Sequence, residues 1–110
     1  MFTAKIRIAA ISLFAAATAF AGAATAADSM SDVAFIAASR CEGLAQGAKI
    51  DAAALKKMLI NQEGARSQYV LDKANEVRDD AKRQASHAQG YAAQTVNDEL
   101  HGPCAAYLKS

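Results

Sequence analysis

The cysteines and histidines of this sequence, Cys41, His87, His101 and Cys104, are the residue types best suited to metal binding or covalent chemistry. His101 precedes Cys104 by three residues, a spacing that can place both side chains on one metal ion. Cys41 and His87 would then have to complete the ligand set. The two cysteines can instead pair with each other, and two cysteines have a single intramolecular pairing. The compartment of the protein decides between these two chemistries.

A carboxylate pair, Asp79-Asp80, is the other candidate for chemistry. Adjacent positions of a helix point about 100° apart, so these carboxylates cannot flank one bond. The sequence has no Gly-x-Ser-x-Gly elbow, no His-Glu-x-x-His, no phosphate-binding glycine loop and no Cys-x-x-Cys-His. We interpret His87 as a surface residue. We therefore expect no enzyme, no catalytic residue, no cofactor and no bound metal.

The first 26 residues have the order of a secretory signal peptide. Lys5 and Arg7 supply a positive start, an uncharged run extends from Ile8 to Phe20, and small residues end the segment at Ala24-Thr25-Ala26. This arrangement matches an Ala-x-Ala cleavage site. The sequence predicts a signal peptide at 1–26, cleavage near Ala26 and a periplasmic or secreted protein.

A retained membrane anchor is the alternative for this segment. The uncharged residues from Ile8 to Ala27 number 20, which is nominally enough to span a bilayer as a helix. More than half of them are alanine, and the strongly apolar side chains lie only in the first two-thirds. We favour cleavage, which leaves residues 27–110 as a single helical domain without a stable membrane span.

Cleavage changes the charge on which the choice of partner depends. The 110-residue chain has 12 Lys plus Arg and 11 Asp plus Glu, a net charge of +1. Loss of 26 residues removes Lys5 and Arg7, so 84 residues remain with 10 basic and 11 acidic side chains and a net charge of −1. A nearly neutral chain has no electrostatic basis for binding nucleic acid or an anionic membrane.

In an exported protein we expect Cys41 and Cys104 to form a structural disulfide. The bridge closes a loop of about 64 residues, to which the chain-entropy model assigns roughly 4 kcal/mol. The mature chain has few large apolar side chains and no tryptophan, and small cores often need such a link. Intermolecular disulfides, or a metal or redox role for the cysteines with His101, are the alternatives, although there is no Cys-x-x-Cys motif.

Residue types favour helix nearly throughout the mature chain, and no stretch alternates strictly enough to predict a strand. We expect a first helix from about Met30 to Gln46, with a capping box formed by Ser29 and Asp32 and with Gly47 as its stop. The spacing of its apolar residues places Phe35 at the edge of the buried face. The residues predicted to form that face are Val33, Ile36, Ala37, Cys41 and Leu44.

A second helix is expected to begin at Asp51 as N-cap. Its predicted inner face consists of Leu55, Met58, Leu59 and Gln62. The apolar pattern continues in phase through Gly64, but we favour a break or kink there. Beyond it, the charge-rich segment Ala65–Ala88 is interpreted as a solvated helix, with Asp79 and Arg83 paired one turn apart.

A weak point at Ser86–Gly90 is expected to precede a last long helix, Tyr91–Leu100. This helix would direct Val96 and Leu100 inward, together with Tyr91 or Ala92. The run His101-Gly102-Pro103 ends it, because proline cannot continue a helix but suits the start of a new turn. That final turn carries Cys104, Tyr107 and Leu108 back toward the first helix.

The resulting prediction is an all-α fold: a small antiparallel bundle of three or four helices, closed by one disulfide and without β-strands. Small side chains let helices approach closely but bury little area each, so the disulfide is expected to matter for stability. The alanines predicted to lie on the inner faces are Ala37, Ala74, Ala81, Ala85, Ala88 and Ala92.

Two classes of small exported helical proteins are similar to this chain. Its size, helical composition and single predicted disulfide resemble the HdeA-like acid-stress chaperones of the bacterial periplasm. Cys41-Glu42-Gly43 and Pro103-Cys104 look similar to the Cys-x-Gly start and the late Pro-Cys of the Tai-type immunity proteins. The chain lacks the middle cysteine and the proline-bearing centre of that class. These resemblances imply a helical architecture, and neither carries a function over.

From these observations we expect a small exported non-enzymatic protein that acts through protein–protein contacts, for example an envelope stress or chaperone-like factor or an inhibitor. The alternative is a small-ligand-binding or metal/redox accessory protein of the envelope, with Tyr69, Tyr91 and Tyr107 as polar anchors of a pocket. The expected partner is another protein, with no nucleic acid, and the sequence leaves its identity and the oligomeric state open.

Overall fold

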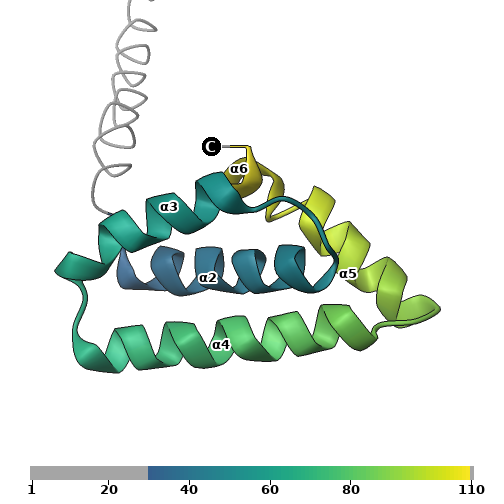
Figure 1. Ribbon diagram of the computed structural model, residues 1–110, viewed down its shortest axis with the longest axis horizontal. Helices are drawn as coiled ribbons and strands as arrows, with labels where there is room; N and C mark the ends of the chain where they lie inside the picture. The colour runs from purple at the N-terminus through teal and green to yellow at the C-terminus, as the bar shows by residue number, and fades with distance from the viewer. Residues whose placement is uncertain (1–29, 110) are drawn as a thin grey trace, which may run out of the picture. The chain divides into compact units, whose positions relative to one another are not determined.

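The computed structural model describes residues 30–109 of the chain (Figure 1). The predicted signal peptide, its cleavage site and Ser29 lie outside the described residues. Residues 31–109 belong to one compact unit, and no helix within 30–109 has the length and apolar character needed to cross a membrane. The described elements are α2 (Asp32–Gly47), α3 (Ala53–Gln62), the 3-10 turn η1 (Glu63–Ala65), α4 (Gln68–His87), α5 (Tyr91–His101) and α6 (Ala105–Leu108).

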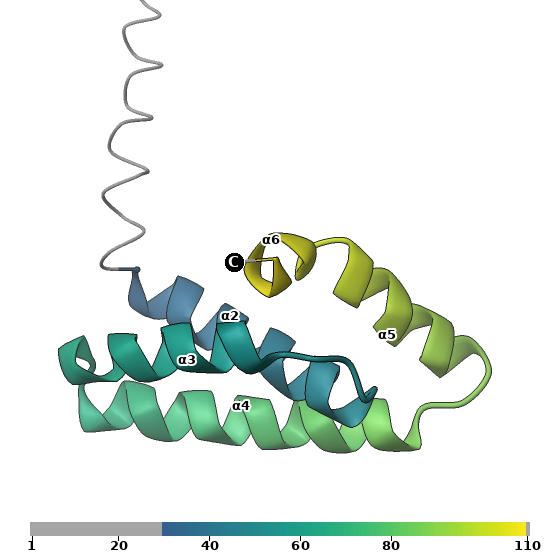
Figure 2. The same ribbon diagram turned by 45° about the horizontal axis from the view of Figure 1, so that its top comes forward.

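Helix α2 lies between α3 and α4 and contacts both (Figure 1). Consecutive helices alternate in direction, so α3 runs antiparallel to its neighbours, while α2 and α4 run parallel to each other (Figures 1 and 2). Helix α5 leaves the far end of α4 and returns toward α6, which contacts α2 and α3. The predicted all-α bundle closed by a disulfide is confirmed, and no strand occurs within the described residues.

The α2–α4 contact brings two helix backbones together. A Cβ atom at Gly43 would lie 2.2 Å from the carbonyl oxygen of Arg78, and one at Gly47 would lie 2.4 Å from that of Lys82. Real Cβ atoms do not approach so closely, so these two positions, one helical turn apart, must be glycine for the helices to cross at this distance. The side chains of α4 nearest to them are both alanines, Ala81 and Ala85.

This contact explains why the predicted buried face of α2 is wrong in its first two turns. Val33 is 79% exposed and Ala37 is exposed, whereas Phe35, placed at the edge by the pattern, is 2% exposed. The prediction followed the large apolar side chains, but small residues determine which side of α2 meets α4. From Ala38 onward the helix is covered on several sides, and Cys41 and Leu44 are buried as predicted.

Both ends of α2 also differ from the prediction. Ser31 is the N-cap, and its hydroxyl accepts a hydrogen bond from the Ala34 N–H at 3.1 Å, in place of the predicted box at Ser29 and Asp32. At the other end, α2 includes Gly47 as its last residue, one residue beyond the predicted end at Gln46, and Gly47 also lies against α4. The left-handed position that follows is taken by Lys49, with φ of 64°.

Helix α3 and the break after it follow the sequence except at the start of the helix. The N-cap is Ala52 rather than the predicted Asp51, although the Asp51 carboxylate accepts a hydrogen bond from the Ala53 N–H at 2.9 Å. Leu55, Leu59 and Gln62 are buried, and Met58 is half-buried. The predicted interruption near Gly64 is confirmed by η1. A new N-cap then starts α4: the Ser67 hydroxyl accepts from the Val70 N–H at 3.3 Å.

The C-terminal third is less buried than α2. Val96 and Leu100 are the buried residues of α5, as predicted, but Tyr91 is 84% exposed. The turn before α5 depends on Gly90, whose φ of 57° favours glycine. The outcome for the predicted inner-face alanines is mixed: Ala74 and Ala81 are buried, Ala85 and Ala88 are half-buried, and Ala37 and Ala92 are exposed.

Candidate functional site

The predicted disulfide is present between Cys41 of α2 and Cys104, the residue before α6. Their sulfur atoms are 2.01 Å apart and their Cα atoms 5.5 Å apart. Cys41 is 4% exposed and Cys104 is 0% exposed. Both sulfur atoms are bonded to each other and enclosed by protein, so neither serves as a metal ligand or a nucleophile in this structure. The bridge ties the C-terminal segment to the central helix.

The histidines lie apart from each other on the surface. His87 Nδ1 is 3.0 Å from the carbonyl oxygen of Arg83, and His101 Nδ1 is 2.9 Å from that of Asn97, each within its own helix. Among residues 30–109 there is no group of three or more His, Cys, Asp or Glu side chains placed to hold a metal ion. The structure therefore does not bring the ligand set considered from the sequence together.

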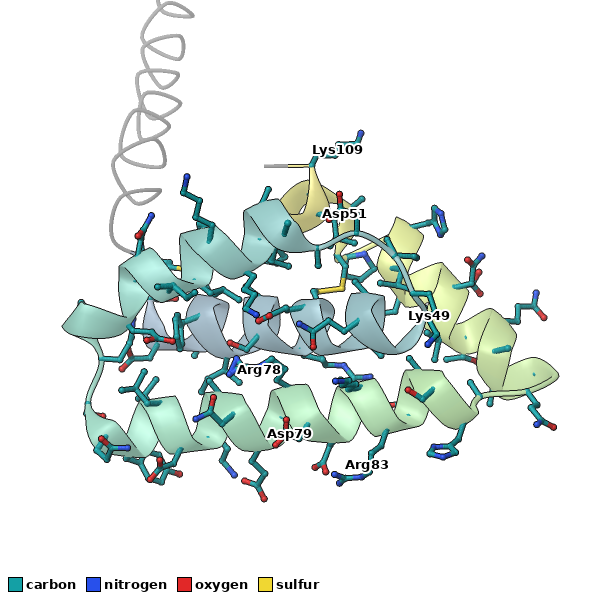
Figure 3. The ribbon with its side chains drawn as sticks, viewed as in Figure 1. Lys49, Asp51, Arg78, Asp79, Arg83 and Lys109 are labelled. Atoms are coloured by element: carbon teal, nitrogen blue, oxygen red, sulfur yellow. A yellow bond between two sulfur atoms is a disulfide. The ribbon has the colours of Figure 1, made fainter. Side chains whose placement is uncertain are left out.

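The charge-rich segment predicted as a solvated helix is solvated only in part. Asp80 and Arg83 are exposed, whereas the side chains of Arg66 and Arg78 are only 4% and 22% exposed. Arg83 contacts Asp80 rather than the predicted Asp79, and Figure 3 shows Arg83 on the side of α4 that faces away from α2.

Two of the three tyrosines proposed as pocket anchors are on the surface. Tyr69 is 72% exposed and Tyr91 is 84% exposed, while Tyr107 is half-buried.

An arginine–carboxylate pair links α2 to α5. The Arg40 Nε donates to Glu99 Oε2 at 2.7 Å and its Nη2 donates to Glu99 Oε1 at 3.0 Å. The hydrogen bonds that Arg40 donates to Glu99 raise the pKa of Arg40, partial burial opposes this rise, and the negative charge of Glu99 adds to it. The pair is about one-third exposed on each side, so it acts as a local link between helices and leaves no free charge.

A second arginine joins the start of α2 to the end of α3. Arg66 Nη1 donates to Asp32 Oδ1 at 2.8 Å, and its Nη2 donates to Gln62 Oε1 at 2.9 Å. Its guanidinium lies 5.0 Å from the centre of the Phe35 ring, a distance typical of a cation–π contact. The side chain is 4% exposed, so Arg66 is used in contacts within the fold and is not available to a ligand.

A hollow of about 410 Å³ lies where α2, α3 and α4 meet, and we call it the α3–α4 groove. Each helix contributes residues one turn apart, a spacing that puts both side chains on one face. Its lining residues are Glu42 and Gln46 from α2, Lys56, Leu59, Ile60 and Glu63 from α3 and η1, and Arg78 and Lys82 from α4.

The base of the groove is the carboxylate of Glu42, whose side chain is 4% exposed. Its Oε2 accepts a hydrogen bond from Gln46 Nε2 at 2.9 Å, and its Oε1 lies 3.5 Å from Arg78 Nη1. Figure 3 shows Arg78 between α4 and α2. A buried carboxylate needs such partners, so Arg78 is occupied by Glu42.

The edges of the groove carry two lysines without partners. Lys56 on α3 and Lys82 on α4 are both exposed, and neither ammonium makes a hydrogen bond or ion pair with another residue of the described chain. Ile60, one turn after Lys56, is 53% exposed. The groove thus combines unpaired positive charge with an exposed aliphatic side chain above a fixed, neutralised base.

Sequence reasoning missed this groove. The signal was three pairs of residues at a spacing of four, Lys56 with Ile60, Arg78 with Lys82, and Glu42 with Gln46. These pairs lie on three separate helices, and nothing in the sequence pattern states that they converge.

Two cavities lie at the other end of the molecule, and Ile50 and Leu100 border both of them. The smaller, about 190 Å³, has a mixed lining that includes Ala48 just after α2, Ala85 of α4, and Ala93 and Asn97 of α5. The larger, about 400 Å³, extends toward Leu108 of α6. Both adjoin the segment that the disulfide holds in place.

The fold and these surfaces define an all-helical protein with a disulfide-tethered C-terminal segment. Comparison of the chain with protein-family models, with curated proteins and with solved structures found no match.

Proposed function

We propose that this protein is a small exported factor of the cell envelope, non-enzymatic, that acts by binding other proteins. A chaperone-like factor or an inhibitor would both work in this way. The observation that carries the proposal is the α3–α4 groove, where Lys56 and Lys82 stand unpaired beside the exposed Ile60. A protein interface places apolar side chains at its centre and polar groups at its rim, and Ile60 with the lysines at the edges of the groove fits that arrangement.

The support beneath the groove favours binding without large rearrangement. Leu59, beside Ile60 on α3, is 3% exposed, and the base carboxylate is held by a hydrogen bond and an ion pair. A surface fixed in this way loses little conformational entropy when it binds. The fixed base of the groove therefore supports a binding role in addition to its volume.

The disulfide supports the export part of the proposal. Disulfides persist in oxidising compartments such as the periplasm and outside the cell. A buried Cys41–Cys104 bridge that ties the C-terminal segment to the central helix fits such a compartment, in line with the signal peptide that the sequence predicts.

A photo-crosslinking residue at position 60 tests the proposal in the cells that export the protein. The matched control carries the same residue at Tyr91, which is more exposed but lies on α5, away from the groove. We expect light-dependent protein adducts from position 60 and not from position 91. Equal adducts from both positions, or none from position 60, would contradict the proposal.

The larger cavity favours a second candidate function, the binding of a small apolar ligand. Its volume of about 400 Å³ falls within the usual size of ligand sites. Native mass spectrometry of protein purified without detergent would show an added mass in this case. Substitution of Ala105, which lines this cavity, by Phe should then reduce the bound fraction, and a protein of unmodified mass would exclude this function.

A further inference from the structure

We infer that the α3–α4 groove binds an acidic segment of its protein partner, with a carboxylate between Lys56 and Lys82 and an apolar side chain against Ile60. This inference rests on the proposed function and specifies the chemistry of the partner.

The charges that face a partner are not those of the whole lining. Arg78 and the buried Glu42 neutralise each other at the base. What remains at the surface is the ammonium groups of Lys56 and Lys82, opposed by the exposed carboxylate of Glu63. The net excess of positive charge at this point contrasts with the net charge of −1 expected for the chain after removal of residues 1–26.

The buried carboxylate also sets how deep an acidic ligand can enter. A carboxylate placed at the base would meet Glu42, and like charges in a partly buried site repel strongly. The favourable position is therefore at the edge, between the lysines of α3 and α4. Lysine suits such an exposed position because its long side chain can extend to a ligand carboxylate while its ammonium group stays hydrated.

Ile60 indicates that the ligand must also carry an apolar side chain. It follows Lys56 by one helical turn and is 53% exposed, so the positive group and the aliphatic group lie side by side along α3. A segment with an Asp or Glu close to an apolar residue satisfies both. Nucleic acid does not, because the neighbouring outer side of α4 carries the acidic residues Asp72, Glu76, Asp79 and Asp80, which repel phosphates.

The crosslinking protein with the photoreactive residue at position 60 tests the inference through the chemistry of the captured segment. The crosslinked partner peptide is sequenced by mass spectrometry and should contain a carboxylate close to the attachment point. The double reversal Lys56→Glu with Lys82→Glu should lower the adduct yield about tenfold, as expected for two exposed ion pairs lost and replaced by repulsion.

A matched control separates charge at the groove from charge in general. Lys57 is the next residue of α3, is exposed and does not line the groove, so Lys57→Glu should leave the adduct yield unchanged. The pair Lys56→Arg with Lys82→Arg should retain the adduct because it keeps both charges. Circular dichroism of each variant checks that the fold is intact.

The outcomes separate the two levels of the proposal. Absence of adducts at position 60 in the otherwise unchanged protein would overturn both the proposed function and this inference. Adducts that survive the double reversal, or that form on a segment without carboxylates, would overturn the inference while the proposed function stands.

Discussion

Helices α4 and α5 both contact α2, but the two contacts are of different kinds. Along α4 the helix backbones meet over at least one full turn, because Gly43 and Gly47 leave room for the carbonyl groups opposite them. Helix α5 buries Val96 and Leu100 and reaches α2 through an ion pair at Glu99 and, beyond its end, the disulfide at Cys104.

The difference indicates how each region should fail. The α2–α4 contact depends on the absence of a side chain at Gly43 and Gly47, one turn apart, so an added methyl group disturbs it. The segment 91–108 depends on a few discrete links beside the two cavities, so it should open when one link is removed. Substitution at Gly43 acts on the α2–α4 contact, and substitution at the disulfide or at Arg40 acts on the links of the segment 91–108.

Removal of the disulfide is expected to have the largest effect. The variant Cys41→Ala with Cys104→Ala frees a link across 63 residues of sequence. We expect its free energy of unfolding to fall by about 2–4 kcal/mol, because the unfolded chain has more conformational entropy without the cross-link. Equilibrium urea unfolding followed by circular dichroism measures this change, and a loss below about 1 kcal/mol would show that the bridge is not a main source of stability.

Gly43→Ala is expected to be second. The new Cβ atom would lie 2.2 Å from a backbone carbonyl oxygen of α4, which cannot move aside as a flexible side chain can. We expect a net loss of about 2 kcal/mol in the free energy of unfolding, although alanine favours the helix by about 1 kcal/mol.

Gly64→Ala is the matched control for this prediction. A Cβ atom there has nothing within 4 Å, so the substitution should be neutral or stabilise by up to about 1 kcal/mol. Gly43→Ala should therefore lower the thermal midpoint of unfolding, whereas Gly64→Ala should leave it unchanged or raise it. Equal shifts would mean that the close approach of α2 and α4 is not what makes Gly43 necessary.

Arg40→Gln is expected to have the smallest effect. The pair with Glu99 is partly exposed, and such pairs contribute about 0.2–1 kcal/mol. Since Glu99 raises the pKa of Arg40, Arg40 stays charged at neutral and moderately basic pH, and this contribution is lost only as the pH rises through the raised pKa. The difference between the variant and the unchanged protein in urea unfolding should thus be the same at about pH 6 and about pH 10. A difference that vanished at the higher pH would contradict this assignment.

The parts of the fold that follow from local sequence were predictable. Two cysteines have one internal pairing, and Gly64 and Gly90 mark helix breaks by residue type, at Gly64 even though the apolar pattern continues through it. The side of α2 that faces α4 was not predictable from large apolar residues. Gly47 illustrates the reason, since its glycine signals a helix stop when considered locally, yet it is required for contact with a helix more than thirty residues away in the sequence.

The candidate site was harder to predict than the fold. Glu42 entered the sequence analysis only as part of Cys41-Glu42-Gly43, although in the structure it is a buried carboxylate paired with Arg78. Its role depends on how α2 and α4 are rotated about their axes. That rotation is set by the glycine–alanine contact, so an error in the face of α2 carried over to the groove.

Residue-resolved hydrogen exchange on the Cys41→Ala, Cys104→Ala variant tests the central claim most directly, namely that α5 and α6 depend on discrete links while α2 and α4 are held by continuous packing. The account predicts that amides of residues 91–108 exchange much faster than those of residues 43–47 and 78–82, by a larger ratio than in the protein with its disulfide intact. An equal increase in exchange in both regions would show a single cooperative unit and would contradict the account.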